Sequence, residues 1–441
     1  MTSPESTVLE DTKILTLPAS PRSREMTPAL TGLFAFAVGL IVINLFAMQP
    51  LVGLVGPSLG LGSAGASLVS AAISVGYAAG LLLLVPLSDL VESRKLIVAT
   101  LGANAAALAL ATVSRSAVTY LAASFLVGLT SSAIQMLIPV AAALSPAARR
   151  GRIIGNVMMG LMVGVLVSRP AGSLVADAFG WRAVDGLAAA AIAGLTLLLA
   201  LFVPEHRQQL RRPYRALIES MWTLLREERL LQVRAVSSAL AFASFSVFWT
   251  TVALRLAQPP FELGQRGIAL FALGGVGGVV MAPLAGRAGD RGWTRSLTLA
   301  AHASIVLACI VAALAGTRGS PLATHRWTAL GLMSAASILM DLGVVADQTL
   351  GRRAMILLRP EAAGRLNGLF TGSFFVGGAV GSAVAGLAWV HGGWASTCIV
   401  AAAFALAAIA WDLLAGARGT GADDSPQLER ADDVPRQVSG S

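Results

Sequence analysis

Charged residues and cysteine are both scarce in this 441-residue chain. Only 12% of its residues are charged, whereas soluble domains carry about 25%. The two cysteines, Cys309 and Cys398, fall in apolar stretches and predict neither a disulfide framework nor a metal site. No Gly-x4-Gly-Lys-Ser/Thr phosphate-binding loop occurs, which argues against ATP-driven work by this chain. No nucleophile, base and metal-ligand set converges among the apolar stretches, so we expect neither an enzyme nor a bound cofactor.

Positive charge is in excess, with a formal net charge of +9. It does not indicate nucleic acid as a partner, because the basic residues lie between apolar stretches and have no basic fold of their own. Lysine and arginine gather in alternate loops, and the positive-inside rule places those loops and both termini in the cytoplasm. The sequence therefore predicts a multi-pass protein of the inner (plasma) membrane, with the lipid bilayer as its surroundings.

Hydrophobic residues make up 56% of the chain and fall into stretches of membrane-spanning length, which is about 20 residues for a helix. The predicted fold class is an all-α membrane protein of twelve transmembrane helices in two pseudo-symmetric six-helix halves, 29–203 and 233–415. The predicted spans are 29–51, 66–87, 95–114, 117–143, 152–176 and 183–203, then 233–256, 266–285, 296–315, 327–346, 365–389 and 394–415.

Polar segments flank and separate the two halves. Residues 1–28 and 416–441 are predicted to be disordered cytoplasmic tails. The central segment 204–232 carries apolar residues at helical spacing, flanked by arginines. This pattern favours an amphipathic helix at the cytoplasmic membrane surface, with a solvated linker as the alternative.

One stretch occurs twice at a constant offset. Residues 151–181 (GRIIGNVMMGLMVGVLVSRPAGSLVADAFGW) align without a gap to residues 364–394 (GRLNGLFTGSFFVGGAVGSAVAGLAWVHGGW). The small residues in both copies would let helix backbones approach closely in lipid. The glycines of the first copy, Gly151 and Gly155 among them, are expected to be points of such approach. Two equivalent helices in two halves indicate a transporter-type internal repeat.

The loop between the second and third spans combines charges of both signs. It reads PLSDLVESRK, from Pro86 to Lys95. Such a short loop favours a carboxylate–guanidinium network that holds neighbouring helices in one state. A simple topology signal with an incidental aspartate is the alternative.

These features together resemble the major facilitator superfamily, and within it the twelve-span drug:proton antiporter-type exporters, over roughly residues 29–415. The family's loop motif, Gly-x-Leu-(small)-Asp-Arg-x-Gly-Arg-(Arg/Lys), is matched in part, with the basic pair one residue late. The resemblance implies a cytoplasmic gate lock at this loop. Its residues are Leu87, Ser88, Asp89, Arg94 and Lys95.

The family's exporter motif on the fifth span, Gly-x8-Gly-x3-Gly-Pro-x2-Gly-Gly, is also matched in its spacing. The matching positions are Gly155, Gly164, Ser168, Arg169, Pro170 and Gly172. Arg169 stands where the family has proline. Through this motif the resemblance implies export rather than import.

Coupling to a gradient usually uses an acid within the membrane, because such residues are rare and functional. Asp341 is our first candidate for proton coupling, with a helix-end pair to Arg352 or Arg353 as the alternative. Arg169 is predicted to face a cavity, and the alternative is that it extends toward the outer interface. Asp177 and Asp185 are expected to anchor the outer loop, the latter with Arg182 at i,i+3 spacing.

Uncharged residues complete the set of cavity candidates. Asn44 and Gln135 could contact substrate or could bond neighbouring helices. Phe245 and Trp249 belong to an aromatic cluster on the seventh span, for which core packing is the commoner explanation. His302 is predicted to be a packing residue, with proton relay as the alternative.

The resemblance and these residues predict a monomeric secondary transporter that uses the proton gradient. It would export a small organic molecule, drug-like or a metabolite, by proton antiport through alternating access. A sugar or metabolite exporter or an uncoupled uniporter is the alternative within transport, and a non-transporting membrane sensor is the alternative outside it.

Overall fold

The computed structural model describes residues 26–204, 213–317, 319–320, 322 and 325–417, apart from the side chain of Asp89. All regular structure in these residues is helical. Both predicted disordered tails lie almost entirely outside the described residues. The predicted all-α class with two six-helix halves is confirmed.

The N-terminal half contains six membrane-crossing spans, of which the first and fourth are each built from two helices. Its α-helices are α1 (Pro28–Phe46), α2 (Val52–Ser58), α3 (Ser63–Leu83), α4 (Ser93–Val113), α5 (Ala117–Ser131), α6 (Ala133–Ala143), α7 (Arg150–Phe179) and α8 (Arg182–Phe202). Short 3-10 turns join them at η1 (Gln49–Leu51), η2 (Val85–Asp89) and η3 (Ala147–Arg149).

The C-terminal half repeats this plan. Its elements are α10 (Arg229–Leu256), α11 (Gln265–Ala272), η4 (Leu273–Gly275), α12 (Val276–Asp290), α13 (Thr294–Gly316), α14 (Arg326–Leu358), η6 (Pro360–Ala362) and α15 (Ala363–Ala417). α14 runs twelve residues beyond the predicted end of the tenth span at 346. Its last turns carry Arg352 and Arg353, so the hydrophobic pattern alone placed the end too early.

α15 contains the last two spans, joined by a sharp turn rather than a loop. Its 55 residues bend at Gly392 and Gly393, and Gly393 has φ of 59°. The equivalent turn of the first half is at Gly180, where φ is 85°. Residues with a side chain rarely adopt this left-handed region, so glycine is required at both turns. The repeated Gly-Trp dipeptide therefore marks the same hairpin in each half.

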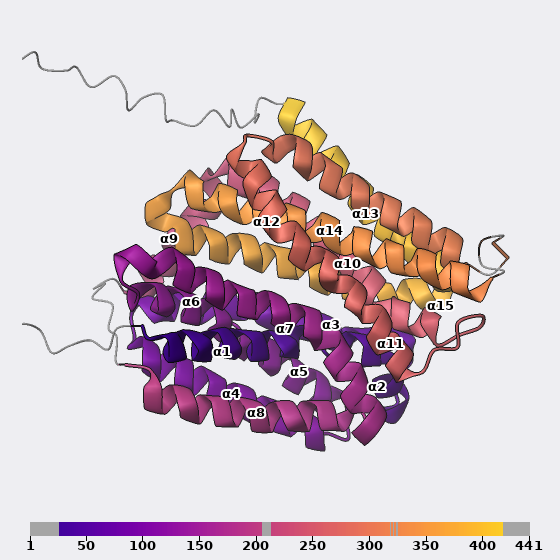
Figure 1. Ribbon diagram of the computed structural model, residues 1–441, viewed down its shortest axis with the longest axis horizontal. Helices are drawn as coiled ribbons and strands as arrows, with labels where there is room; N and C mark the ends of the chain where they lie inside the picture. The colour runs from indigo at the N-terminus through magenta and orange to yellow at the C-terminus, as the bar shows by residue number, and fades with distance from the viewer. Residues whose placement is uncertain (1–25, 205–212, 318, 321, 323–324, 418–441) are drawn as a thin grey trace, which may run out of the picture.

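The two halves lie against each other along their length. In Figure 1, α1–α8 form the lower layer and α10–α15 the upper one, with α7 lying beside α11. Contacts between the halves join α3 to α15, α7 to α11, and α10 to η1 and α2. The last two sets use the ends of α7 and α10 that are predicted to face the periplasm. The halves are therefore closed against each other at that end.

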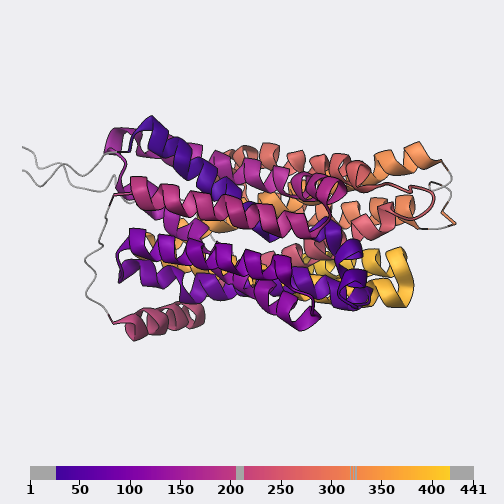
Figure 2. The same ribbon diagram turned by 90° about the horizontal axis from the view of Figure 1, so that it is seen from below.

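A short helix lies at the opposite end of the bundle. α9 (Tyr214–Glu227) occupies the position of the predicted amphipathic helix and lies beside the packed spans at the lower left of Figure 2. Its buried residues are Leu217, Met221 and Leu224, and the last two pack on apolar side chains of the C-terminal half. The Tyr214 hydroxyl donates a hydrogen bond to the Leu83 carbonyl oxygen of α3, 3.0 Å away. α9 therefore contacts both halves.

Candidate functional site

Arg169 lies on α7 at the interface between the halves and is 2% exposed. Its Nε donates to Oε1 of Gln49, 3.0 Å away. Its guanidinium carbon lies 4.1 Å from the centroid of the Trp249 ring and 5.2 Å from the Phe46 and Phe245 rings. Aromatic faces attract a cation, so this shell compensates part of the cost of burying it. Arg169 does not extend to the membrane surface, and the alternative of an outward-pointing side chain is wrong.

Asp341 approaches the same point from the C-terminal half. It lies on α14 and is 5% exposed, and Nε1 of Trp249 donates to its Oδ1 over 3.0 Å. It makes no ion pair with Arg353, which contacts Asp290 instead over 3.2 Å. Trp249 thus touches both charged residues, Arg169 with its ring face and Asp341 with its N–H group. The two charges that the sequence singled out are brought together by an indole between them.

Breaks in two spans supply further groups to this cluster. The first span is interrupted between α1 and α2, and Gln49 lies in that interruption. The eighth span is interrupted at η4, where a methyl group added to Gly275 would lie 3.1 Å from Oδ2 of Asp341. Interrupted helices line substrate sites in many transporter folds. The predicted spans 29–51 and 266–285 contain no break at these points, because an interruption of three residues leaves the hydrophobic pattern intact.

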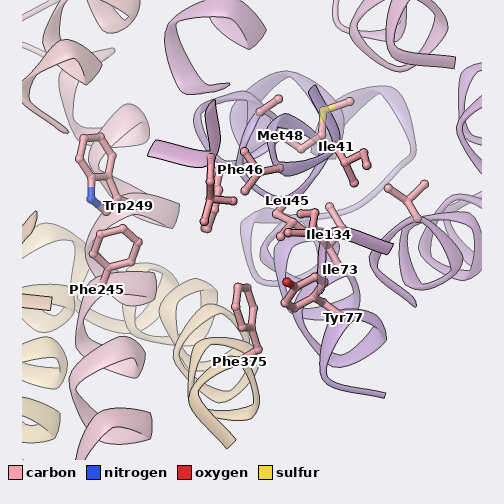
Figure 3. Close-up of a cluster of buried hydrophobic side chains, with 14 of the residues drawn as sticks. Ile41, Leu45, Phe46, Met48, Ile73, Tyr77, Ile134, Phe245, Trp249 and Phe375 are labelled. Carbon is pink, nitrogen blue, oxygen red and sulfur yellow. The ribbon is translucent and has the colours of Figure 1, made fainter. Parts of the chain in front are cut away.

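Aromatic side chains from both halves surround the cluster. Figure 3 shows Phe46 and Tyr77 of the N-terminal half facing Phe245, Trp249 and Phe375 of the C-terminal half. The Tyr77 and Phe375 ring centroids are 4.4 Å apart across the interface. The predicted aromatic cluster on the seventh span therefore forms part of the contact between the halves.

The uncharged polar candidates lie elsewhere. Nδ2 of Asn44 donates to Oδ1 of Asn104 over 3.1 Å, inside the N-terminal half. Gln135 lies beside the Tyr77 hydroxyl. Neither residue contacts Arg169 or Asp341. Gln49, an uncharged polar residue of the same span as Asn44, is the one that reaches the cluster, through its contact with Arg169.

The exporter-motif residues place α7 against α1. A methyl group added at Gly164 would clash with the Gly39 carbonyl oxygen, and one at Gly172 would clash with that of Ala47. The repeat does the same in the second half, where Gly377 packs on Ala239 of α10. Gly151 and Gly155 were expected to be points of close helix approach, and this prediction is wrong. A methyl group added at either position would meet nothing within 4 Å. Both glycines are exposed, on a face of α7 that no helix of the described residues covers at these positions.

The remaining motif positions on α7 are structural neighbours of Arg169. Ser168 is fully buried, and its hydroxyl donates to the Val165 carbonyl oxygen over 2.7 Å. Pro170 lies inside the continuous helix. They leave Arg169 as the one charged side chain of this motif.

The first part of the loop motif, including Leu87, lies in the 3-10 turn η2, whereas Arg94 and Lys95 lie in the first turn of α4. The Ser88 hydroxyl donates to the Val85 carbonyl oxygen over 2.7 Å. Arg94 donates to the Ala200 carbonyl oxygen of α8, and Lys95 pairs with Glu92 over 3.2 Å. The side chain of Asp89 lies outside what the structure describes. These contacts lie within the N-terminal half, and a lock formed by this loop stays a prediction.

A buried charge network lies in the C-terminal half. Asp347 of α14 receives a hydrogen bond from Arg234 of α10 over 2.9 Å. His302 of α13 lies between two carboxylates, 3.3 Å from Asp347 and 3.1 Å from Asp412. Four helices therefore meet through charged groups, and His302 is more than the packing residue that the sequence predicted. Spacing along the chain gave no signal for this network, because its members come from four separate spans.

The acidic residues near the outer turn have other partners than expected. Asp177 of α7 pairs with Arg266 of α11 over 2.7 Å, which joins the two halves. Asp185 accepts a hydrogen bond from the Tyr120 hydroxyl over 3.0 Å. The predicted Arg182–Asp185 contact is wrong, since Arg182 donates to the Ser114 carbonyl oxygen. Arg182 therefore bonds a backbone carbonyl oxygen and Asp185 bonds a side chain of another span, and the two do not pair with each other at i,i+3 spacing.

The fold of two six-helix halves with a site between them is also found in a known family of membrane proteins. The family model for the Major Facilitator Superfamily matches residues 34–346. The chain belongs to this superfamily of multi-pass membrane transporters.

Named relatives and solved structures agree with this assignment. The chain is 33% identical to the putative uncharacterized transporter YgaY of Escherichia coli (strain K12), over 87% of this chain and 95% of the relative. It is 30% identical to the probable transporter SCO4007 of Streptomyces coelicolor, over 91% and 92%. The crystal structure of the nucleoside transporter NupG superposes with a TM-score of 0.68 at 13% identity, covering 86% of this chain and 99% of NupG. That likeness concerns the fold.

Proposed function

We propose that this transporter exports a small organic molecule, drug-like or a metabolite, by antiport with protons. The observation that carries the proposal is the buried pairing of Arg169 and Asp341 around Trp249, one charge from each half. Alternating access moves two halves about a site between them. A site built from both halves is therefore rearranged whenever the halves rock.

Asp341 is the proposed proton-binding group. It is a buried carboxylate at the interface between the halves, and its Oδ1 accepts a hydrogen bond from Trp249. A substrate that donates a hydrogen bond to the carboxylate competes with a proton for the same oxygen atoms. That competition is what exchange of substrate for protons requires, because each of the two must leave before the other binds.

Arg169 favours a second candidate, cotransport of an organic anion with a proton. Its Nη2 is buried and has no hydrogen-bond partner among the residues that the structure describes. An anion bound there would remove the charge that faces Asp341, so that the carboxylate would take up a proton together with the anion. In this case substrate and proton would move in the same direction.

Proteoliposomes with an internal pH dye distinguish these candidates. Lipophilic cations, sugars and organic acids would each be added outside, in the absence of a pH gradient. Antiport predicts that a substrate raises the internal pH, cotransport predicts that it lowers it, and a facilitator predicts uptake of labelled substrate at constant pH. The direction of transport is tested in inside-out vesicles, where an acidic lumen should drive accumulation of the exported compound.

Asp341→Asn is the variant that tests the proton site. The amide keeps the hydrogen bond from Trp249 but cannot bind a proton, so substrate-induced pH changes should disappear while downhill exchange persists. Glu219→Gln is the matched control, because Glu219 is an exposed carboxylate on α9 paired with Arg215. An unchanged pH signal in the Asp341 variant would remove it as the coupling group.

A further inference from the structure

The N-terminal half contains a cavity of about 190 Å³ that is separate from the site at the interface. It lies among α1, α4, α5, α7 and α8, and neither Arg169 nor Asp341 lines it. Most of its wall is apolar, with Ile43, Leu108, Val127 and Val175 among the lining side chains. An apolar cavity of about 150 Å³ admits benzene in another protein, so this one has room for a ligand with a single ring.

One charged side chain lines this cavity among the described residues, and it is Asp185. The residue is 6% exposed. Its Oδ2 accepts the hydrogen bond from Tyr120, and no lysine, arginine or histidine of the described residues forms an ion pair with it. A buried carboxylate in apolar surroundings is costly unless a proton or a cation compensates it.

The nearest arginine along the chain does not supply that cation. Arg182, one turn before Asp185 on α8, donates to the Ser114 carbonyl oxygen over 3.2 Å and stacks 4.2 Å from the centroid of the Trp181 ring. The other polar groups on the wall are also engaged. Nδ2 of Asn44 donates to Asn104, and the Ser124 hydroxyl donates to the Tyr120 carbonyl oxygen. Asp185 is thus the group on this wall whose negative charge a bound cation would compensate.

We propose that this cavity binds a small organic cation, a protonated amine carrying one ring or an alkyl group of similar size. The ammonium group contacts the Asp185 carboxylate, and the apolar body fills the space against Ile43, Leu108 and Val127. The cavity reaches the lipid-facing side of α8, because Leu187 both lines it and is 53% exposed. An apolar amine dissolved in the bilayer can enter by this route. The site does not depend on the transport function proposed above.

Equilibrium dialysis of the full chain in detergent tests this inference, with radiolabelled 2-phenylethylamine as the probe. We expect saturable binding of one molecule per chain. The neutral analogue 2-phenylethanol should compete at least about tenfold more weakly, because hydrogen bonds to charged groups are the stronger ones. Asp185→Asn should lower the affinity for the amine by a similar factor. Asp341→Asn should leave it unchanged, because that carboxylate lies outside the cavity.

A second variant keeps the test decisive if Asp185→Asn does not fold. Ala188→Leu fills the cavity from α8 and keeps the carboxylate, so amine binding should be lost. The inference is overturned if the alcohol competes as well as the amine, or if Ala188→Leu binds the amine normally. Loss of binding in Asp341→Asn would overturn it as well, since the amine would then occupy the interface. Absence of saturable binding to the wild-type chain has the same consequence.

Discussion

Arg169 combines a buried charge with a stacked geometry that lysine cannot reproduce. A guanidinium is planar, so it can lie over an aromatic ring and donate from Nε at the same time. The structure uses both properties, with Trp249 on one side and Gln49 at Nε. The position therefore requires the shape of arginine as well as its charge.

Arg169→Lys should consequently reduce transport at least about tenfold, the effect expected when a buried charged group loses its hydrogen-bond geometry. The measurement is the initial rate of substrate-dependent flux at equal protein content. Arg326→Lys is the control, because Arg326 lies 5.5 Å from the exposed Trp327 ring in the same kind of contact. A wild-type rate for Arg169→Lys would mean that charge alone matters there.

The network around Asp347 gives a prediction about stability. Removing one partner of a buried ion pair leaves the other charge uncompensated, at a cost of about 3–5 kcal/mol. Arg234→Met, which deprives Asp347 of its guanidinium, should lower the free energy of unfolding by that amount in a detergent titration. Arg215→Met breaks the exposed pair with Glu219 and should cost at most about 1 kcal/mol. Equal effects of the two variants would contradict the structural role of the network.

For single residues, the sequence predicts which charged side chains lie within membrane spans more readily than it predicts their contact partners. Arg169 and Asp341 stand out because charges inside spans are rare. Their meeting through Trp249 does not follow from spacing, since the three residues come from different spans in different halves. Asp177, Asp185 and His302 were assigned local or packing roles, and each has a partner far away along the chain.

The pairing of α1 with α7, and of α10 with the first part of α15, is the recurring element of the fold. In both cases a glycine of the later helix touches a backbone carbonyl oxygen of the earlier one, Gly164 on Gly39 and Gly377 on Ala239. Close approach of this kind is how helices associate in lipid. The repeat in the sequence is therefore a repeat of one helix contact.

Gly164→Ala should destabilise this contact, because the added methyl group would clash with a backbone atom that cannot turn away. Overpacking of this kind costs about 1–3 kcal/mol. Gly155→Ala is the matched control on the same helix, since a methyl group there meets nothing. Thermal unfolding followed by tryptophan fluorescence should show a lower Tm for the first variant and no decrease for the second. Alanine favours the helix over glycine, so a decrease of the same size in both variants would contradict a specific role for the Gly164 contact.

Most elements could be predicted from the sequence, because apolar stretches of about 20 residues are a strong signal. The prediction failed where the backbone changes direction inside such a stretch. The break at η1 and the break at η4 leave the hydrophobic pattern uninterrupted, whereas the glycine turn within α15 falls between the predicted spans 365–389 and 394–415. Both breaks contribute to the site, through Gln49 and Gly275.

On the scale of the whole molecule, the halves are joined at the predicted periplasmic end by the ion pair of Asp177 and Arg266. Arg266 is largely exposed, so the pair is a surface one worth at most about 1 kcal/mol. Such a contribution changes the ratio of closed to open molecules by at most about fivefold. The pair therefore biases the closed arrangement without fixing it.

Asp177→Asn should accordingly increase opening at this end. A cysteine placed at Leu254, which lies against Gly53 across the interface, would report it through labelling by a membrane-impermeant maleimide. Both native cysteines are buried, which keeps the background low. The control is Asp290→Asn, which breaks an ion pair with Arg353 inside one half and should leave labelling unchanged. Slower labelling in Asp177→Asn than in the wild type would contradict this role.

The pairing of Arg169 with Asp341 also has an electrical consequence. With the carboxylate ionised, the two groups sum to zero charge, and with a proton on it they sum to one positive charge. The membrane potential acts on a moving charge with about 2.3 kcal/mol per elementary charge per 100 mV. In the antiport that we propose, rocking of the protonated, empty protein would therefore be driven by voltage, whereas rocking of the ionised form would not. Capacitive currents from supported membranes should therefore grow as the pH falls.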